Sequence, residues 1–188
     1  MSSRVMRTLR ATICAGVLAA GLAVSTGAGA GELSDKSVQT LLEYAWALMP
    51  DKFTKPDGKV ITIDKTKKQD ALIPLEAARI VIKIADRSSK AQICKLLQKQ
   101  LENHRTMMKR EEESKKWSDQ QLLFINQLHL FVVMLNTGNV EVVEKDGENE
   151  VKTSSAEGGA AAATGKTPCT EEQKKAIEDE INAFVSGS

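Results

Sequence analysis

The sequence predicts a mainly α-helical fold: a small bundle of four to five helices around one buried central helix, with one or two short β-hairpins and a disulfide-tethered C-terminal helix. Three observations support this fold class. Residues 118–137 are apolar on nearly every side of a helix, which is typical of a helix packed on most of its surface. Several flanking segments repeat apolar residues at the spacing of amphipathic helices. The third observation is the pair Cys94 and Cys169, which remains after removal of an N-terminal export signal.

The N-terminal segment 1–30 has the pattern of a secretory signal peptide. Three arginines and no acidic residue precede an apolar run over 11–24, and Ala28-Gly29-Ala30 offers a cleavage site after Ala30. A membrane anchor is the alternative, but the apolar run is short and rich in Gly and Ala. We therefore expect a periplasmic or secreted protein, with no transmembrane segment after cleavage.

The mature chain, residues 31–188, has almost balanced charge. The signal peptide carries three basic and no acidic residues, which leaves 23 basic and 25 acidic residues and a formal charge of −2. This balance argues against a nucleic-acid partner. In an exported chain an even pair of cysteines is typical of a disulfide, so we expect Cys94 to bond Cys169. The sequence holds no Cys-x-x-Cys motif, which argues against a dithiol oxidoreductase.

The first predicted helix begins at a cap on Ser34 or Asp35 and reaches about Met49, where Pro50 ends it. Residues 55–58 read as a turn, and the β-branched residues 60–63 follow as a short strand.

The second predicted helix starts near Ile73, with Pro74 in its first turn and Asp70 as a cap. Ser88 or Ser89 opens a third helix that reaches about Lys115. The third helix carries an apolar stripe formed by Ile93, Leu97, Leu101, His104 and Met108.

The central helix has signals at both ends. Ser118 and Gln121 have the spacing of a capping box, and Trp117 can pack on Leu122 as a hydrophobic staple. Gly138 is placed to end the helix in the left-handed conformation. We expect the helix over 89–115 to be its antiparallel partner.

A hairpin follows, with strands over 140–144 and 148–153 around an Asp146-Gly147 turn. This register pairs Lys145 with Glu148 and Glu141 with Lys152. Residues 154–168 are rich in Ser, Gly and Ala and read as a flexible linker. Residues 169–188 form the last helix, opened by Thr170 and Gln173. The predicted organisation is thus signal peptide 1–30, helical domain 31–153, linker 154–168 and C-terminal helix 169–188.

Motifs for chemistry are scarce in this chain. Gly165-Lys166-Thr167 resembles the end of a phosphate-binding loop, but the glycine required five residues before Gly165 is Ala160. The acidic residues 146–150 lack the order of a calcium-binding EF-hand loop. The sequence matches no serine-hydrolase elbow, zinc-protease or dinucleotide motif, so we assign no catalytic residue and no cofactor.

The two histidines, His104 and His129, form one testable pair. If the helices over 89–115 and 118–137 turn near Trp117, His104 lies 13 residues before the turn and His129 lies 12 after it. At a rise of about 1.5 Å per residue the two rings would lie at nearly the same height. The favoured interpretation is a pair of core histidines; a pH switch and a metal site are the alternatives. A metal would need a third ligand, such as Glu43 or Glu76.

The sequence therefore favours an exported, non-enzymatic protein of the cell envelope with a structural or protein-interaction role and an unknown protein partner. Two alternatives stay open. One is a periplasmic chaperone or stress protein, which would use exposed methionines among Met49, Met107, Met108 and Met134. The other is a hydrolase, or a binder of a small ligand or metal, whose site the fold assembles.

Overall fold

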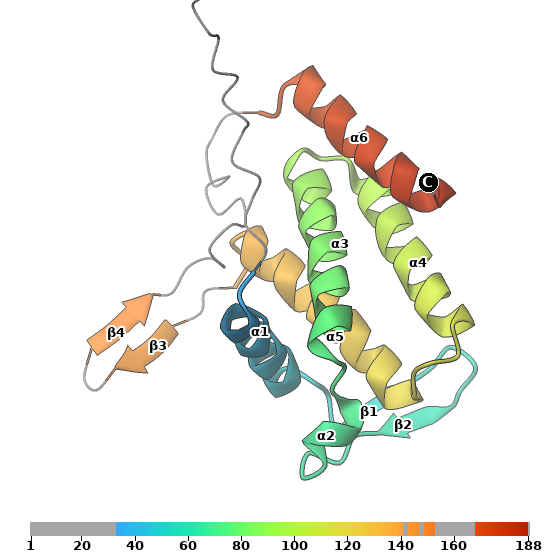
Figure 1. Cartoon of the computed structure of the whole chain (residues 1–188), viewed down its shortest axis with the longest axis vertical. Coiled ribbons are helices and arrows are strands. Elements are labelled where there is room, and N and C mark those ends of the chain that lie inside the picture. Colours follow the sequence, from blue (N-terminus) through green and yellow to red (C-terminus); the bar gives the residue numbers. More distant parts are fainter. Residues whose placement is uncertain (1–32, 141–142, 147–148, 153–167, 188) are drawn as a thin grey trace, which may run out of the picture.

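The computed structural model describes residues 33–140, 143–146, 149–152 and 168–187, and it is mainly helical (Figure 1). Six helices and two separate two-stranded antiparallel sheets occur in these residues. The mainly helical prediction is therefore confirmed. The predicted signal peptide and nearly all of the predicted linker lie outside the described residues. Within the described ranges, no helix is long and apolar enough to cross a membrane.

Helix α1 (Asp35–Ala47) begins as predicted, because the Ser34 side chain accepts a hydrogen bond from the Ser37 backbone N–H. The first hairpin then forms from β1 (Lys52–Thr54) and β2 (Val60–Thr62), with Phe53 opposite Ile61. Strand β2 and its turn were predicted, whereas β1 was not.

The short helix α2 (Lys68–Ala71) was also not predicted. Asp70 lies inside α2 and does not cap the next helix, which corrects the expected role of this residue. Pro74 is the N-cap residue of α3 (Leu75–Ile93), one position earlier than expected.

The predicted start of the third helix at Ser88 or Ser89 is wrong. Both serines lie inside α3 and are buried, and the Ser89 hydroxyl donates to the Ala85 carbonyl one turn back. A serine can satisfy its hydroxyl in this way within a helix, so a serine pair does not by itself mark a helix start.

The true break lies at residues 94–96, before α4 (Leu97–Glu113). The Leu96 N–H donates to the Ala91 carbonyl at 2.8 Å and the Lys95 N–H to the Gln92 carbonyl at 3.0 Å. These two bonds form a Schellman motif, in which the residue corresponding to Lys95 takes a left-handed conformation. Lys95 has φ +62°, a conformation that glycine usually adopts. Because this residue is a lysine, the sequence carries no glycine signal for the end of α3.

Helix α5 (Asp119–Asn136) is the predicted central helix, with the Ser118–Gln121 capping box present and Gly138 at φ +73°. The prediction that the helix over 89–115 is the main partner of α5 is only partly right, because α4 contacts α5 but is not its main partner. Helix α5 packs mainly on α3 and α1, and α4 packs mainly on α3 (Figure 1). The main hydrophobic core lies among α1, α3 and α5, where Phe124, Ile125, Leu128 and Phe131 are fully buried.

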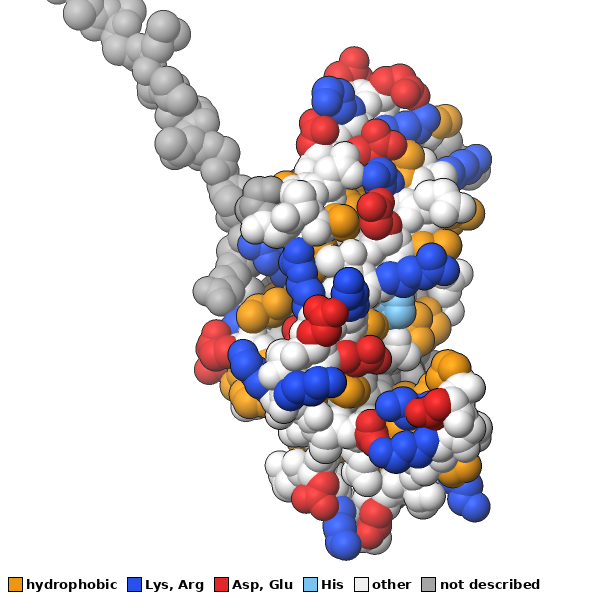
Figure 2. Space-filling view, turned by 90° about the vertical axis from the view of Figure 1, so that its right-hand side faces the viewer, with side chains coloured by type: hydrophobic (Ala, Val, Ile, Leu, Met, Phe, Trp, Pro, Cys, Tyr) orange, Lys and Arg blue, Asp and Glu red, His pale blue; other side chains and the backbone are white. Residues whose placement is uncertain are grey.

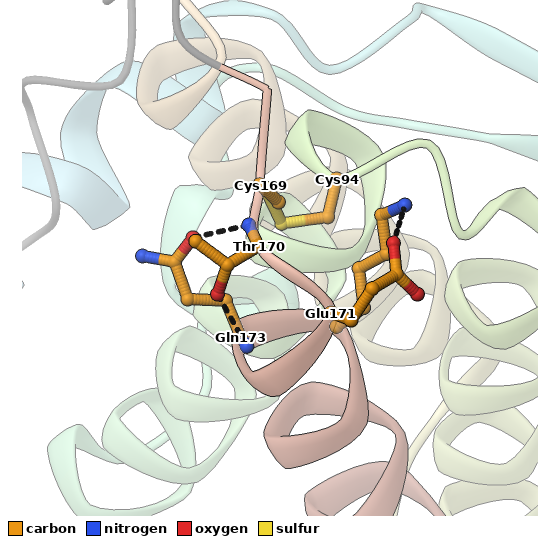
Figure 3. The surroundings of a disulfide bond; sticks show 6 residues. Cys94, Cys169, Thr170, Glu171 and Gln173 are labelled. Carbon is orange, nitrogen blue, oxygen red and sulfur yellow. Dashed lines mark hydrogen bonds and ion pairs between the residues drawn. A yellow bond between two sulfur atoms is a disulfide. The ribbon is translucent and has the colours of Figure 1, made fainter.

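Helix α6 (Glu171–Ser186) packs on α3 and α4, and the predicted Thr170–Gln173 capping box opens it. The predicted disulfide joins Cys94 to Cys169 just before this cap (Figure 3). Ile177 and Ile181 are buried beside the bridge in a second, smaller cluster. The predicted covalent tether of the C-terminal helix is therefore present; Cys94, which we expected near the start of a helix, lies at the end of α3.

Strands β3 (Val143–Asp146) and β4 (Asn149–Lys152) form the second hairpin. Its predicted register is wrong, because Lys145 lies opposite Glu150 and Val143 lies opposite Lys152. Glu141 and Glu148, the other members of the predicted pairs, lie outside the described residues.

Candidate functional site

The structure brings His104 and His129 together. His104 lies on α4 and His129 on α5, and their ring centroids are 4.6 Å apart with the rings tilted by 36°. The prediction from helical rise, that the two histidines lie at the same height on neighbouring helices, is therefore confirmed. Whether the pair binds a metal or responds to pH is a separate question.

His129 belongs to a buried polar network that joins three helices. Its Nε2 lies 3.0 Å from Ser88 Oγ on α3, and the Asn103 amide on α4 donates to the same hydroxyl oxygen at 2.8 Å. Asn103 also donates to the Ile84 carbonyl at 2.9 Å. Because Ser88 Oγ already accepts from Asn103, its own proton is free to point at His129 Nε2. The sequence analysis took Ser88 as a possible helix start and did not single out Asn103, because no local pattern marks a contact between helices.

Burial controls the charge of His129. The side chain is 2% exposed, and its Nδ1 has no hydrogen-bond partner within the described part of the chain. Burial, helped by the neighbouring His104, lowers the pKa of His129 from 6.5 to about 3. His129 is therefore neutral at physiological pH and acts as a polar member of the core.

His104 differs from His129 because it lies partly at the surface. Its Nε2 forms a 2.8 Å hydrogen bond with Asn126 Oδ1, one helical turn before His129 on α5. The pair thus runs from the sealed interior at His129 to the surface at His104.

The geometry offers little to a metal ion. Nε2 of each ring already has a hydrogen-bond partner, and among residues whose positions are described no group of three or more His, Cys, Asp or Glu side chains is placed to hold a metal ion. Glu43 instead forms an ion pair with Lys68, between α1 and α2. Glu76 lies in the first turn of α3. Neither proposed third ligand joins the histidines.

A serine hydrolase would also need a different arrangement. Ser88 and His129 are in contact, but Ser88 is fully buried, so no substrate reaches its hydroxyl in this conformation. In a catalytic triad a third group orients the histidine through Nδ1. Here Asn103 contacts the serine instead, and Nδ1 of His129 is unpaired across the described residues.

A shallow cavity of about 550 Å³ lies where α1, α2 and the starts of α3 and α5 meet. Its polar lining consists of Gln39, Glu43, Gln69 and Gln121. Gln121 already donates to the Leu72 carbonyl and Glu43 pairs with Lys68, so half of these groups serve the fold. The apolar part of its lining consists of Leu42, Leu72, Ile73, Pro74 and Leu75.

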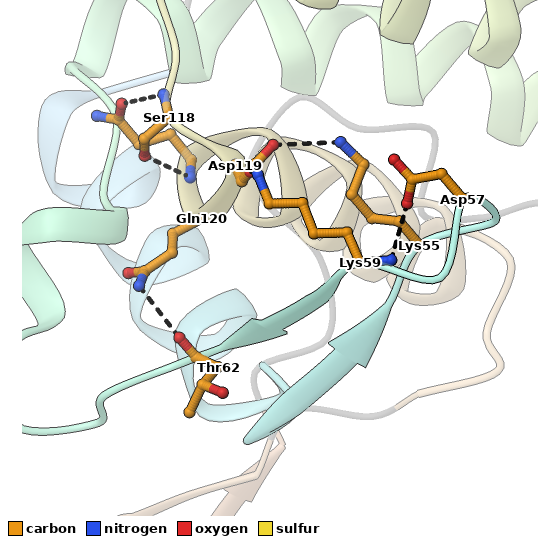
Figure 4. Close-up of polar contacts among 8 residues, drawn as sticks. Lys55, Asp57, Lys59, Thr62, Ser118, Asp119 and Gln120 are labelled. Atoms are coloured by element: carbon orange, nitrogen blue, oxygen red, sulfur yellow. Dashed lines mark hydrogen bonds and ion pairs between the residues drawn. The ribbon is translucent and has the colours of Figure 1, made fainter.

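A charged cluster fastens the first hairpin to α5. Asp119, in the first turn of α5, pairs with Lys55 at 3.2 Å and with Lys59 (Figure 4). The two lysine ammonium groups, Lys59 first, lower the pKa of Asp119. Gln120 adds a bond to the Thr62 carbonyl at 3.2 Å. Both lysines already pair with Asp119, which makes this cluster a structural clamp.

The remaining feature is a set of three exposed leucines, Leu97 and Leu101 on α4 and Leu130 on α5, which we call the strip. These leucines are 57%, 42% and 43% exposed. Leu101 and Leu97 lie one and two turns before His104 on α4, and Leu130 lies one turn after Asn126, the partner of His104. Leu101 and Leu130 therefore each lie one turn from a member of the His104–Asn126 hydrogen bond, and His104 itself is half-buried. Figure 2, which faces the side of α4 and α6, shows a surface histidine with hydrophobic side chains next to it.

Leu97 and Leu101 belong to the apolar stripe named from the sequence, but both side chains are exposed. In the structure Asn103 and Met107 are the buried residues of α4, and the leucine stripe lies to one side. Among the 18 residues of α5 only Asp119 is charged, although only eight of them are buried. After Asp119, the residues of α5 outside the core are thus uncharged; Leu130 is exposed and the others are half-buried.

Neither protein-family models, nor curated proteins, nor solved structures provide a match to this chain.

Proposed function

We propose that the chain is an exported, non-enzymatic protein of the cell envelope that acts by binding another protein. The observation that carries this proposal is the exposure of Leu97, Leu101 and Leu130 on two helices that the His104–Asn126 hydrogen bond joins, together with the lack of charged residues in α5 after Asp119. Depletion of charge together with exposed apolar side chains is the compositional mark of the central part of a protein interface. Export is supported by the sequence of residues 1–30 and by the disulfide, which is typical of oxidising compartments.

The alternatives have less support. Met49 and Met107 are buried, and Met108 and Met134 are half-buried, so these four methionines do not form the exposed surface that a chaperone role would use. The Ser88–His129 pair is buried, which argues against a hydrolase. The histidines lack a third ligand in the described ranges, which argues against a metal binder.

The test is capture from an envelope extract with the exported, disulfide-bonded protein as bait. We expect the wild type to retain a specific protein and the double variant Leu101→Glu/Leu130→Glu to lose it. Ile80→Glu is the matched control, because Ile80 is 57% exposed but lies near the start of α3, far along the helix from Cys94 and α4. Equal capture by the wild type and the double variant would refute the strip as the binding surface. Circular dichroism and thermal unfolding must show that both variants are folded.

A further inference from the structure

Helix α4 is joined to the rest of the bundle through the polar network around His129. We infer that α4, together with α6, is a flap that opens in acid: protonation of His129 beside His104 separates α4 from α3 and α5, while the core among α1, α3 and α5 stays folded. This device does not depend on the proposed function. It has three parts, which are the buried histidine pair, the sparse packing of α4 and a left-handed residue at each end of this helix.

Helix α4 buries few of its own side chains. Only Asn103 and Met107 among its 17 residues are buried. Asn103 is polar, and Met108, which packs against the main core, is half-buried. By contrast, α5 buries eight residues, and α4 touches α5 in few places. Elements with few buried apolar contacts open at a lower free energy than the core, so α4 can separate without unfolding of the whole domain.

The polar contacts of α4 converge on His129. Asn103 donates to Ser88 Oγ, which lies 3.0 Å from His129 Nε2, and the His104 ring centroid is 4.6 Å from that of His129. A protonated His129 would donate from both ring nitrogens, but its Nδ1 has no acceptor within the described part of the chain. When α4 leaves, Asn103 and His104 leave with it and water reaches the ring. The open form therefore accommodates the charge that the closed form does not.

The charge on His129 has no compensating carboxylate among the described residues. Burial first, and then the charge of His104, lower the pKa of His129, and both act in the same direction. Arg105, next to His104 on α4, is exposed. Titratable and charged side chains of the surrounding helices make contacts elsewhere, namely Tyr44–Phe131 and Glu43–Lys68 from α1, Asp86–Lys90 and Arg87–Phe184 from α3, and Lys99–Glu102 within α4. Helix α5 has no charged residue after Asp119.

Both ends of α4 adjoin a residue in the left-handed conformation. Lys95 precedes the helix with φ +62° and Lys115 follows it with φ +56°, and no other residue except glycine has a positive φ in the described ranges. A side chain makes this conformation unfavourable. A movement of α4 that relaxes the two positions is therefore favoured, and we take Lys95 and Lys115 as its hinges.

Helix α6 is attached to both ends of α4. Cys169, just before α6, bonds to Cys94 directly before the first hinge, and the small apolar cluster of α6 includes Cys94. Near the other end of α4, Arg110 donates to the Phe184 carbonyl at 2.7 Å. The two helices lie side by side, on the side of α3 away from α1 (Figure 1). Helix α6 therefore moves with α4.

Methionine oxidation by hydrogen peroxide tests the flap in the exported, disulfide-bonded protein. Met107 is buried on α4 and becomes accessible when α4 leaves, whereas Met49, which follows α1, is buried in the part that stays folded. The oxidation rate of each residue is read by tandem mass spectrometry. The closed form holds the pKa of His129 at about 3 and the open form returns it to 6.5, so a change from pH 7.5 to pH 5 should raise Met107 oxidation about 30-fold. The rate at Met49 should not change.

Three variants separate the parts of the device. His129→Gln should remove the acid-induced rise at Met107, and His104→Gln, which keeps His129, should retain most of it. Lys115→Gly removes the unfavourable conformation of the second hinge and should slow Met107 oxidation about five-fold at both pH values. The wild type decides the matter if His129→Gln does not fold, because its Met107 oxidation should rise about tenfold for each pH unit between pH 5.5 and pH 4.

The contrary results are equally specific. Equal acid-induced rises at Met107 and Met49 would show that acid unfolds the whole domain, which excludes a flap. A wild-type rate at Met107 that does not depend on pH, or a rise that persists in folded His129→Gln, would exclude His129 as the trigger. Unchanged or faster oxidation in Lys115→Gly would exclude the hinge at this residue.

Discussion

The buried state of His129 predicts that acid destabilises this protein in a particular pH window. The folded protein holds the pKa of His129 near 3, whereas the same group in the unfolded chain has a pKa of 6.5. Between these values the unfolded chain binds a proton that the folded chain does not. The free energy of unfolding therefore falls as the pH falls from about 6.5 to about 3, and the contribution of His129 is fully present only above this window.

The magnitude follows from the gap between the two pKa values of His129. At about 1.4 kcal/mol for each pH unit, the gap of about 3.5 corresponds to a loss of roughly 5 kcal/mol below pH 3. The total stability of a small domain is about 5–15 kcal/mol, so this single group takes a large share of it. The structural reason is that the imidazolium would lie 2% exposed, with no partner for Nδ1 among the described residues and with His104 beside it.

The assay is urea unfolding followed by tryptophan fluorescence, repeated between pH 4 and pH 7.5 on the disulfide-bonded protein. His129→Gln removes the titrating group and can still bond to Ser88, so its unfolding free energy should depend on pH less steeply, by up to about 1.4 kcal/mol per pH unit. Carboxylates titrate in both proteins and cancel in the difference. His104→Gln is the control that keeps His129 buried, and it should retain most of the slope.

One result would refute this reasoning: the wild type and His129→Gln showing the same pH dependence from pH 4 to 6.5. It would mean that His129 is protonated in the folded protein without penalty, and that the network of Ser88 and Asn103 accommodates the charge.

Two further predictions concern the ends of helices. Reducing the Cys94–Cys169 disulfide should lower the free energy of unfolding by about 4 kcal/mol, given the 75-residue separation. It should also make α6 more sensitive to protease than the other helices; unchanged digestion within α6 would contradict the role of the bridge. Lys95→Gly should raise the free energy of unfolding by about 1 kcal/mol, because glycine adopts the left-handed conformation of this position without the strain of a side chain. Lys83→Gly, at an exposed position inside α3, is the control and should lower the free energy of unfolding by a similar amount. If both substitutions changed the free energy of unfolding in the same direction, the result would be inconsistent with the Schellman motif.

Local signals predicted much of the fold because they depend on neighbouring residues only. The capping boxes at Ser118 and Thr170 mark helix starts through side-chain bonds to nearby backbone N–H groups, and both are present in the structure. The break at 94–96 was not predictable in the same way. Its left-handed residue is Lys95 rather than glycine, and the serines that suggested a break lie inside α3.

The candidate site was predictable in part, for a similar reason. Helical rise alone places His104 and His129 at one height, and this required only the position of the turn. The partners of His129 required the packing of three helices, since Ser88 lies on α3 and Asn103 on α4. The hairpin register failed because a shift of the turn by one residue changes every cross-strand pair.

Packing explains most of the apolar residues of α5, but it does not explain the exposed side of this helix. Phe124, Leu128 and Phe131 are fully buried, so the core requires them. Leu130 is 43% exposed and does not belong to the main core cluster. Substitutions at such surface positions usually change stability by less than about 0.5 kcal/mol. A Leu130→Glu variant that keeps its stability but loses its partner would therefore separate the role of this face in binding from its role in folding.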